Sequence, residues 1–118
     1  MKEITTEQLD IFRKGGQLEE IFDYVIITMK TCPICDILKE KASEIFGDLN
    51  NKIVWYTYII KPGVNLIAKI FAQLDIKNIK VPIIIYRYQE NNIWKIGAIT
   101  DINENNINNL KEKLSLKH

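Results

Sequence analysis

The chain has 118 residues and a net charge of +1, and 47% of its residues are hydrophobic. This length and apolar content are those of one globular domain with a core of its own. The near-neutral charge gives no reason to expect a nucleic-acid partner, and no apolar run approaches the roughly 18 residues that a membrane helix needs. The polar start lacks the apolar stretch of a secretory signal, so we expect a cytoplasmic protein without a membrane partner.

The first predicted element is a helix that begins at Thr5, because Thr5 and Gln8 have the spacing of a capping box. The glycine pair at 15–16 is expected to end this helix. Apolar residues at helical spacing then predict a second short helical piece over residues 17–22. Residues 1–23 would thus form an N-terminal helical segment ahead of the core.

The first predicted strand covers residues 24–29, whose continuous apolar character is typical of a central strand with both faces covered. A helix is predicted over residues 33–46, with Gly47 as its C-cap. The aromatic and β-branched run at 52–60 predicts a long strand, which the Pro-Gly pair at 62–63 should end.

Asn65 is expected to cap a helix over residues 66–74, where the apolar residues recur on one helical face. Residues 82–88 and 93–99 are predicted to pair as an antiparallel hairpin. The four residues at 89–92 predict a turn longer than a two-residue loop.

Asp101 and Glu104 have the spacing of a cap for a last helix, which carries an amphipathic stripe. The element order is therefore α-β-α-β-α-β-β-α. It predicts an α/β fold with a mixed central sheet of about four strands and helices on both faces. We expect a single domain over residues 1–118, with its core at 24–114.

Both cysteines of the chain belong to Cys32-Pro33-Ile34-Cys35, at the junction of a predicted strand and a predicted helix. Two cysteines three residues apart lie on one helical face, close enough to form a disulfide. Cys32 would stand at the first turn, where unpaired N–H groups and the helix dipole favour a thiolate, so we expect its pKa below the usual value of about 8.5. Pro33 suits the first helical position, and Cys35 should be more buried.

Two alternatives remain beside this interpretation, a structural role and a zinc site. The two cysteines would be purely structural if they were buried and inert. A zinc site needs about four ligands, and the chain adds only His118 at its very end. Zinc would therefore need half a site from each chain of a dimer, and we expect no metal. Lys30 and Lys39 flank the motif and would either stabilise a thiolate or be ordinary solvated charges.

The chain resembles the thioredoxin family from Tyr24 to Leu114. Four pieces carry the resemblance in the right order: the Thr31–Cys35 motif, the stretch Leu74–Pro82 with its hydrophobic-Pro pair, the hairpin Ile83–Ile99, and the segment Gly97–Asp101 before the last helix. The resemblance implies a thioredoxin-like fold.

The same resemblance assigns the site. It implies that Cys32 is the catalytic nucleophile and Cys35 the resolving thiol. It also implies that Pro82 forms a cis peptide that faces the pair. The implied substrate-binding residues are Thr31, Pro33, Ile34, Val81, Pro82 and Gly97.

The motif itself departs from the thioredoxin pattern. Thr31 stands where thioredoxins usually carry a tryptophan, and the Pro33-Ile34 dipeptide is closer to the Cys-Pro-Tyr-Cys of glutaredoxins. Glutaredoxins, however, end their hairpin with Gly-Gly and a glutathione-binding aspartate, whereas Ala98 follows Gly97 here. Asp101 is the candidate counterpart of that aspartate.

A second departure concerns the resolving step. Six residues before the first cysteine, thioredoxins keep a buried acid, and this position is Ile26 here. The usual lysine partner in the next strand is replaced by Thr57.

We therefore expect a thiol–disulfide oxidoreductase with a redox-active disulfide, which reduces protein disulfides in cell redox homeostasis and electron transport. The alternatives are a glutaredoxin-type reductase that takes electrons from glutathione, and a non-catalytic adaptor of a larger enzyme. We expect no cofactor, a monomer, protein disulfides as substrates, and thioredoxin reductase or glutathione as the electron donor.

Overall fold

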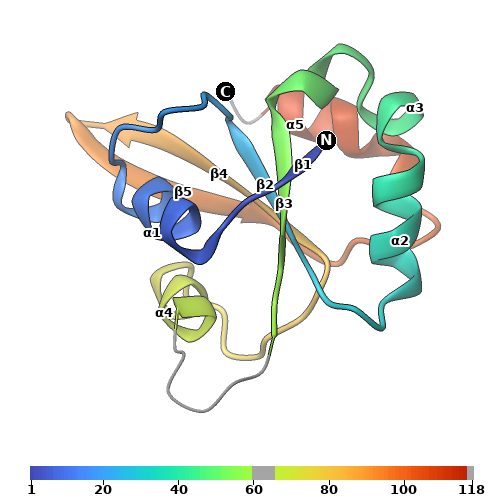
Figure 1. Ribbon diagram of the computed structural model, residues 1–118, viewed down its shortest axis with the longest axis horizontal. Coiled ribbons are helices and arrows are strands. Elements are labelled where there is room, and N and C mark those ends of the chain that lie inside the picture. Colours follow the sequence, from blue (N-terminus) through green and yellow to red (C-terminus); the bar gives the residue numbers. More distant parts are fainter. Residues whose placement is uncertain (60–65, 117–118) are drawn as a thin grey trace.

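Five strands form one mixed sheet in the order β1-β3-β2-β4-β5, with helices on both of its faces (Figure 1). The computed structural model describes residues 1–59 and 66–116. The elements are β1 (Lys2–Glu3), α1 (Thr6–Lys14), β2 (Tyr24–Thr28), α2 (Pro33–Glu40), α3 (Ala42–Phe46), the 3-10 helix η1 (Gly47–Lys52), β3 (Ile53–Thr57), α4 (Leu66–Gln73), β4 (Ile83–Glu90), β5 (Ile93–Ile99), the 3-10 helix η2 (Ile107–Asn109) and α5 (Leu110–Leu116).

The expected α/β architecture is confirmed, with one strand more than the sequence predicted. Strands β1, β3 and β2 run parallel, and β4 and β5 add antiparallel pairing at the other side of β2. The additional strand is β1, in which Lys2 pairs with Val54 and Glu3 with Trp55. Two residues are too few to show the alternation that reveals a strand in sequence.

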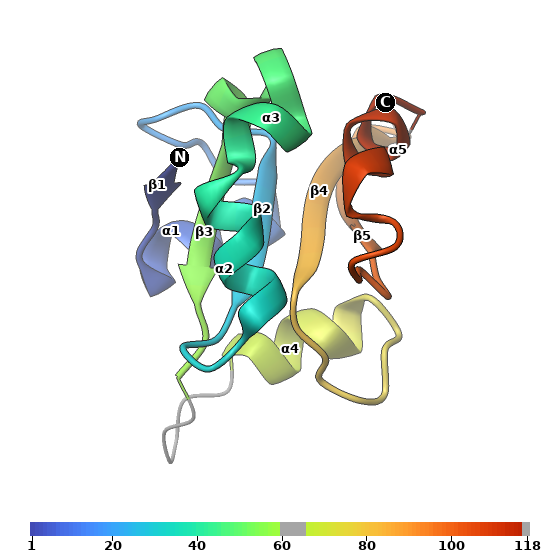
Figure 2. The same cartoon turned by 90° about the vertical axis from the view of Figure 1, so that its right-hand side faces the viewer.

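Two apolar layers enclose the sheet. Helices α1 and α4 cover one face, and α2, α3 and α5 cover the other (Figures 1 and 2). The fully buried β2 explains this arrangement, because Val25 and Ile27 enter the α1–α4 layer while Tyr24 and Ile26 enter the α2–α3–α5 layer. No helix of the described residues is long and apolar enough to cross a membrane.

The start of α1 is as predicted. The hydroxyl of Thr5 accepts a hydrogen bond from the Gln8 N–H, and the Gln8 side chain accepts one from the Thr5 N–H, which completes the capping box. Gly15 ends the helix in a left-handed conformation with φ of 76°. Its C-cap therefore follows the rule that favours glycine there.

The predicted helical piece over residues 17–22 is wrong, because this segment is irregular. Leu18 and Phe22 pack on the core without a helix, whereas Ile21 is exposed. Phe22 stacks on Phe12 with ring centroids 5.4 Å apart. Directly before the segment, the Arg87 guanidinium donates to the Gly16 carbonyl across 2.8 Å.

The helix predicted over residues 33–46 is two helices, α2 and α3, which meet at Lys41 with φ of −106° and ψ of 20°. The hairpin turn is shorter than predicted. It consists of Asn91 and Asn92, both at positive φ (53° and 64°), as a two-residue turn of this kind requires.

The cap predicted for the last helix is also wrong. Asp101 has a φ of 58°, and α5 begins only at Leu110. The Asp101 carbonyl accepts hydrogen bonds from the side chains of Asn103 and Asn106 instead, which folds this stretch as a turn. The predictions for Pro62, Gly63, Asn65 and His118 fall outside the described residues.

Candidate active site

The cysteine pair lies where the sequence predicted, between the end of β2 and the start of α2. Cys32 and Cys35 form a disulfide with their Cα atoms 5.2 Å apart. Cys32 is the N-cap of α2 and Pro33 its first residue. The Cys32 sulfur accepts a hydrogen bond from the Cys35 N–H across 3.2 Å, so it occupies the place of a capping oxygen.

Exposure differs along the motif. Thr31 and Pro33 are exposed, Cys32 and Ile34 are partly exposed, and Cys35 is fully buried. A partly exposed first cysteine and a buried second cysteine are the arrangement that lets one cysteine meet another molecule while its neighbour stays inside.

Pro82 reaches the same end of the sheet from another strand. The Val81–Pro82 peptide is cis, as predicted, and Pro82 is buried while Val81 is partly buried. In the β2–β4 ladder Ile27 pairs with Ile83. Continuing this register puts Pro82 opposite Thr28, at the point where the chain leaves β2 toward Cys32.

Gly97, in contrast, is not brought to this end. It pairs with Tyr86 in the β4–β5 ladder, and a Cβ added at Gly97 would lie 2.5 Å from the Tyr86 phenol oxygen. Gly97 precedes Asp101 by four residues, about 13 Å along an extended chain. Because glycine has no side chain, the Tyr86 ring can lie close to the β5 backbone at Gly97.

The two flanking lysines have different surroundings. Lys30 is exposed. The Lys39 ammonium lies over the Trp55 ring, 5.2 Å from the ring centroid, which is a cation–π contact. Lys39 is therefore engaged with the sheet, one helical turn beyond Cys35.

Ile26 is fully buried in the layer beneath α2, with Trp55 and Ile84 as its partners on the two neighbouring strands. No group of three or more His, Cys, Asp or Glu side chains that would hold a metal occurs among the described residues.

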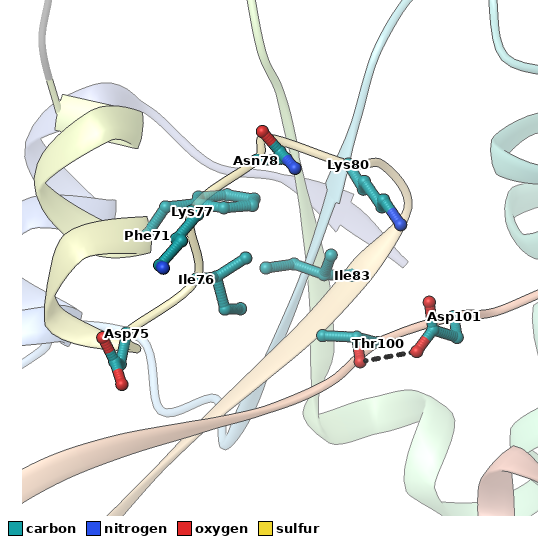
Figure 3. A pocket seen from close by; sticks show the side chains of 9 residues that line it. All are labelled: Phe71, Asp75, Ile76, Lys77, Asn78, Lys80, Ile83, Thr100 and Asp101. Carbon is teal, nitrogen blue, oxygen red and sulfur yellow. Dashed lines mark hydrogen bonds between the residues drawn. The ribbon is translucent and has the colours of Figure 1, made fainter.

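A pocket of about 320 Å³ opens at the start of β4, between the α4–β4 connection and the residues that follow β5 (Figure 3). Phe71, Ile76 and Ile83 give it an apolar lining. Figure 3 shows Lys77 and Lys80 on the α4–β4 connection and Asp101 at the end of β5, with the Thr100 hydroxyl donating to the Asp101 carboxylate across 3.3 Å. Sequence reasoning noted Asp101 but missed the lysines, because only the fold brings them together.

The fold and this site define a small α/β protein with a Cys-x-x-Cys pair at the N-terminus of a helix, in disulfide-bonding position. A comparison with protein-family models, curated proteins and solved structures finds no match to this chain. Its function is therefore inferred from the geometry of the site itself.

Proposed function

We propose that this protein is a thiol–disulfide oxidoreductase with a thioredoxin-like fold, which reduces protein disulfides through Cys32 and Cys35. One observation carries the proposal. The partly exposed Cys32 caps α2 while the fully buried Cys35 lies one turn inside the same helix, and the cis Val81–Pro82 peptide directly precedes β4, the strand beside β2.

The reaction follows from this difference in exposure. The Cys32 thiolate attacks one sulfur of a substrate disulfide, which forms a mixed disulfide and releases the other substrate sulfur as a thiolate. The Cys35 thiolate then attacks the Cys32 sulfur, which closes the Cys32–Cys35 disulfide and releases the second substrate thiolate. Two electrons pass to the substrate, and a donor returns the protein to the dithiol.

The helix start supports the first step. The N–H groups at the start of α2 and its dipole favour an anion at Cys32. The hydrogen bond from the Cys35 N–H to the Cys32 sulfur has the geometry that would stabilise a thiolate there.

Turnover of insulin disulfides with dithiothreitol as donor tests the proposal. Catalysis by the natural protein and none by Cys32→Ser would support it. Equal, uncatalysed rates for both would overturn it and favour the non-catalytic adaptor. The proposal places the protein in a reducing compartment such as the cytoplasm, where dithiols persist.

The pocket at the start of β4 favours one second candidate, a glutaredoxin-type reductase. Glutathione carries two carboxylates and one ammonium group, and the pocket offers Lys77, Lys80 and Asp101 to them. Reduction of the oxidised protein by glutathione, compared with reduction by thioredoxin reductase and NADPH, separates the two catalysts. Lys80→Ala should slow the glutathione reaction alone if the second candidate is right.

A further inference from the structure

Thr28 is the one polar side chain that is fully buried among the described residues. It is the last residue of β2, and three residues separate it from Cys32. Because side chains alternate along a strand, Thr28 shares the face of Tyr24 and Ile26, which is the face that α2 covers. A hydroxyl under the redox helix needs a partner to offset its burial.

Two polar groups of Thr28, its hydroxyl and its carbonyl, bond to residues at the end of β3. Its hydroxyl donates to the Tyr56 carbonyl across 3.2 Å. Its own carbonyl accepts from the Tyr58 N–H across 2.6 Å. The two bonds hold the end of β2 and the end of β3 together, directly before the chain turns to Cys32.

Thr28 is also the residue around which the site is arranged. Its partner in the β2–β3 ladder is Thr57, and the continued β2–β4 register puts Pro82 on its other side. The exit of β3, the loop to Cys32 and the start of β4 therefore all meet at Thr28.

We propose that Thr28 is a positioning residue for Cys32: its hydroxyl fixes the end of β2 on β3 and thereby keeps the Cys32 sulfur at the N-cap of α2. Only three residues separate Thr28 from Cys32, so a shift at the end of β2 is passed on to Cys32. A looser end of β2 lets Cys32 leave the N-cap, where the Cys35 N–H and the helix dipole stabilise the thiolate. This inference rests on the proposed function of Cys32 as the attacking thiol.

The test measures the alkylation rate of Cys32 in the reduced protein by iodoacetamide over a range of pH, which gives the pKa and the limiting reactivity of the thiol. Thr28→Val keeps the shape and burial but removes the hydroxyl, and Thr28→Ser keeps the hydroxyl. The charged neighbours Lys30 and Asp36 stay unchanged in both variants. We expect Thr28→Val to slow alkylation near neutral pH by about threefold to tenfold, the factor that one net hydrogen bond is worth.

Thr6→Val is the matched control. The Thr6 hydroxyl bonds the Tyr56 phenol across 2.9 Å, so this variant removes a threonine bond to the same tyrosine. Tyr56 belongs to the layer of α1 and α4, on the face opposite α2. Thr6 is exposed whereas Thr28 is fully buried, so we expect a smaller loss of stability in Thr6→Val than in Thr28→Val. Slower alkylation is expected only in Thr28→Val, with Thr28→Ser close to the natural protein.

An alkylation profile of Thr28→Val equal to that of the natural protein would overturn the inference, as would equal slowing in Thr6→Val. If Thr28→Val does not fold, Thr28→Ala takes its place in the same comparison. Alkylation reports on Cys32 whether or not the protein reduces any protein disulfide. Failure of the inference is thus distinguishable from failure of the proposed function, which insulin turnover reports.

Discussion

The Cys35 N–H donates a hydrogen bond to the Cys32 sulfur across 3.2 Å, while Cys32 is partly exposed and Cys35 is fully buried. The Cys32 sulfur at the N-cap is the acceptor, and the Cys35 N–H in the first turn of α2 is the donor. The two thiols of the reduced protein should therefore differ in reactivity.

We expect Cys32 to be the attacking thiol and Cys35 the resolving thiol. Cys32→Ser should lower disulfide reductase activity by about a thousandfold or more, because the nucleophile is lost. Cys35→Ser should instead accumulate mixed disulfides with substrates, visible as mass adducts that reductant removes. Preferential alkylation of Cys35 in the reduced natural protein would contradict the assignment.

The sequence predicted the centre of this site because its determinants are local. A buried strand, a proline at the first helical residue and two cysteines one turn apart are all contained within residues 24–35, and the structure confirms the strand-to-helix junction. The cis peptide at Pro82 was predicted from the resemblance to thioredoxins and is confirmed.

The errors come from features that depend on distant parts of the chain. Residues 17–22 have helical spacing, yet Phe22 is held by stacking on Phe12 rather than by a helix. Strand β1 exists only because β3 offers a partner edge. The role of Thr28 depends on its bond to the Tyr56 carbonyl, 28 residues further along the chain, and an apolar run with one threonine gives no sign of it.

Gly15 is expected to be intolerant of any side chain. Its φ of 76° disfavours an L-residue, and a Cβ there would overlap the Trp94 side chain. Gly15→Ala should lower the free energy of unfolding by more than the roughly 1–2 kcal/mol of the backbone alone. Urea denaturation measures the loss.

Removal of the neighbour separates the two causes of this loss. In a Trp94→Gly background the cost of Gly15→Ala should fall to the backbone part, because the overlapping side-chain atoms of Trp94, its Cβ included, are gone. Equal costs in both backgrounds would show that the contact with Trp94 does not matter.

Tyr24 and Tyr86 are partners in the β2–β4 ladder, and burial raises the pKa of both phenols above the usual value of 10. The neutral phenol is thus favoured in the folded protein. Its stabilising effect is fully present below the pKa of the unfolded chain and is lost as the pH rises through the higher pKa of the folded state.

The free energy of unfolding should therefore decline above about pH 10, where the unfolded chain releases these protons first. Tyr86→Phe should reduce the slope of that decline, and the absorbance titration of phenolate should lose a component that titrates above pH 10 in the natural protein. An unchanged slope in both Tyr86→Phe and Tyr24→Phe would refute this origin of the alkaline decline.

Ile26 removes the expected proton acceptor from the resolving step, which makes a testable difference to its rate. In thioredoxins a buried acid at this position is thought to take the proton from the resolving thiol, and Ile26 takes none. It is fully buried beneath α2 between Trp55 and Ile84. Asp36 follows Cys35 directly, but adjacent helical residues point about 100° apart, so its carboxylate is a poor substitute.

We therefore expect a resolving step that depends on water or hydroxide and accelerates as the pH rises. Ile26→Asp should lower the free energy of unfolding by about 3–5 kcal/mol, because an unpaired carboxyl replaces a packed side chain. The same variant should speed resolution near neutral pH. Asparagine has nearly the shape of aspartate but cannot take the proton. Ile26→Asn should therefore lose stability without speeding the resolving step.

Stopped-flow measurement of mixed-disulfide decay decides between these outcomes, with Cys32 first charged with a substrate thiol. The natural protein should show a rate that rises steadily between about pH 6 and pH 9, whereas Ile26→Asp should show a plateau set by the coupled titration of its carboxyl and the Cys35 thiol. A flat rate in the natural protein would mean that another group takes the proton from Cys35. Because Ile26, Trp55 and Ile84 fill this position with apolar side chains, such a base would have to come from the exposed end of α2 or from the substrate.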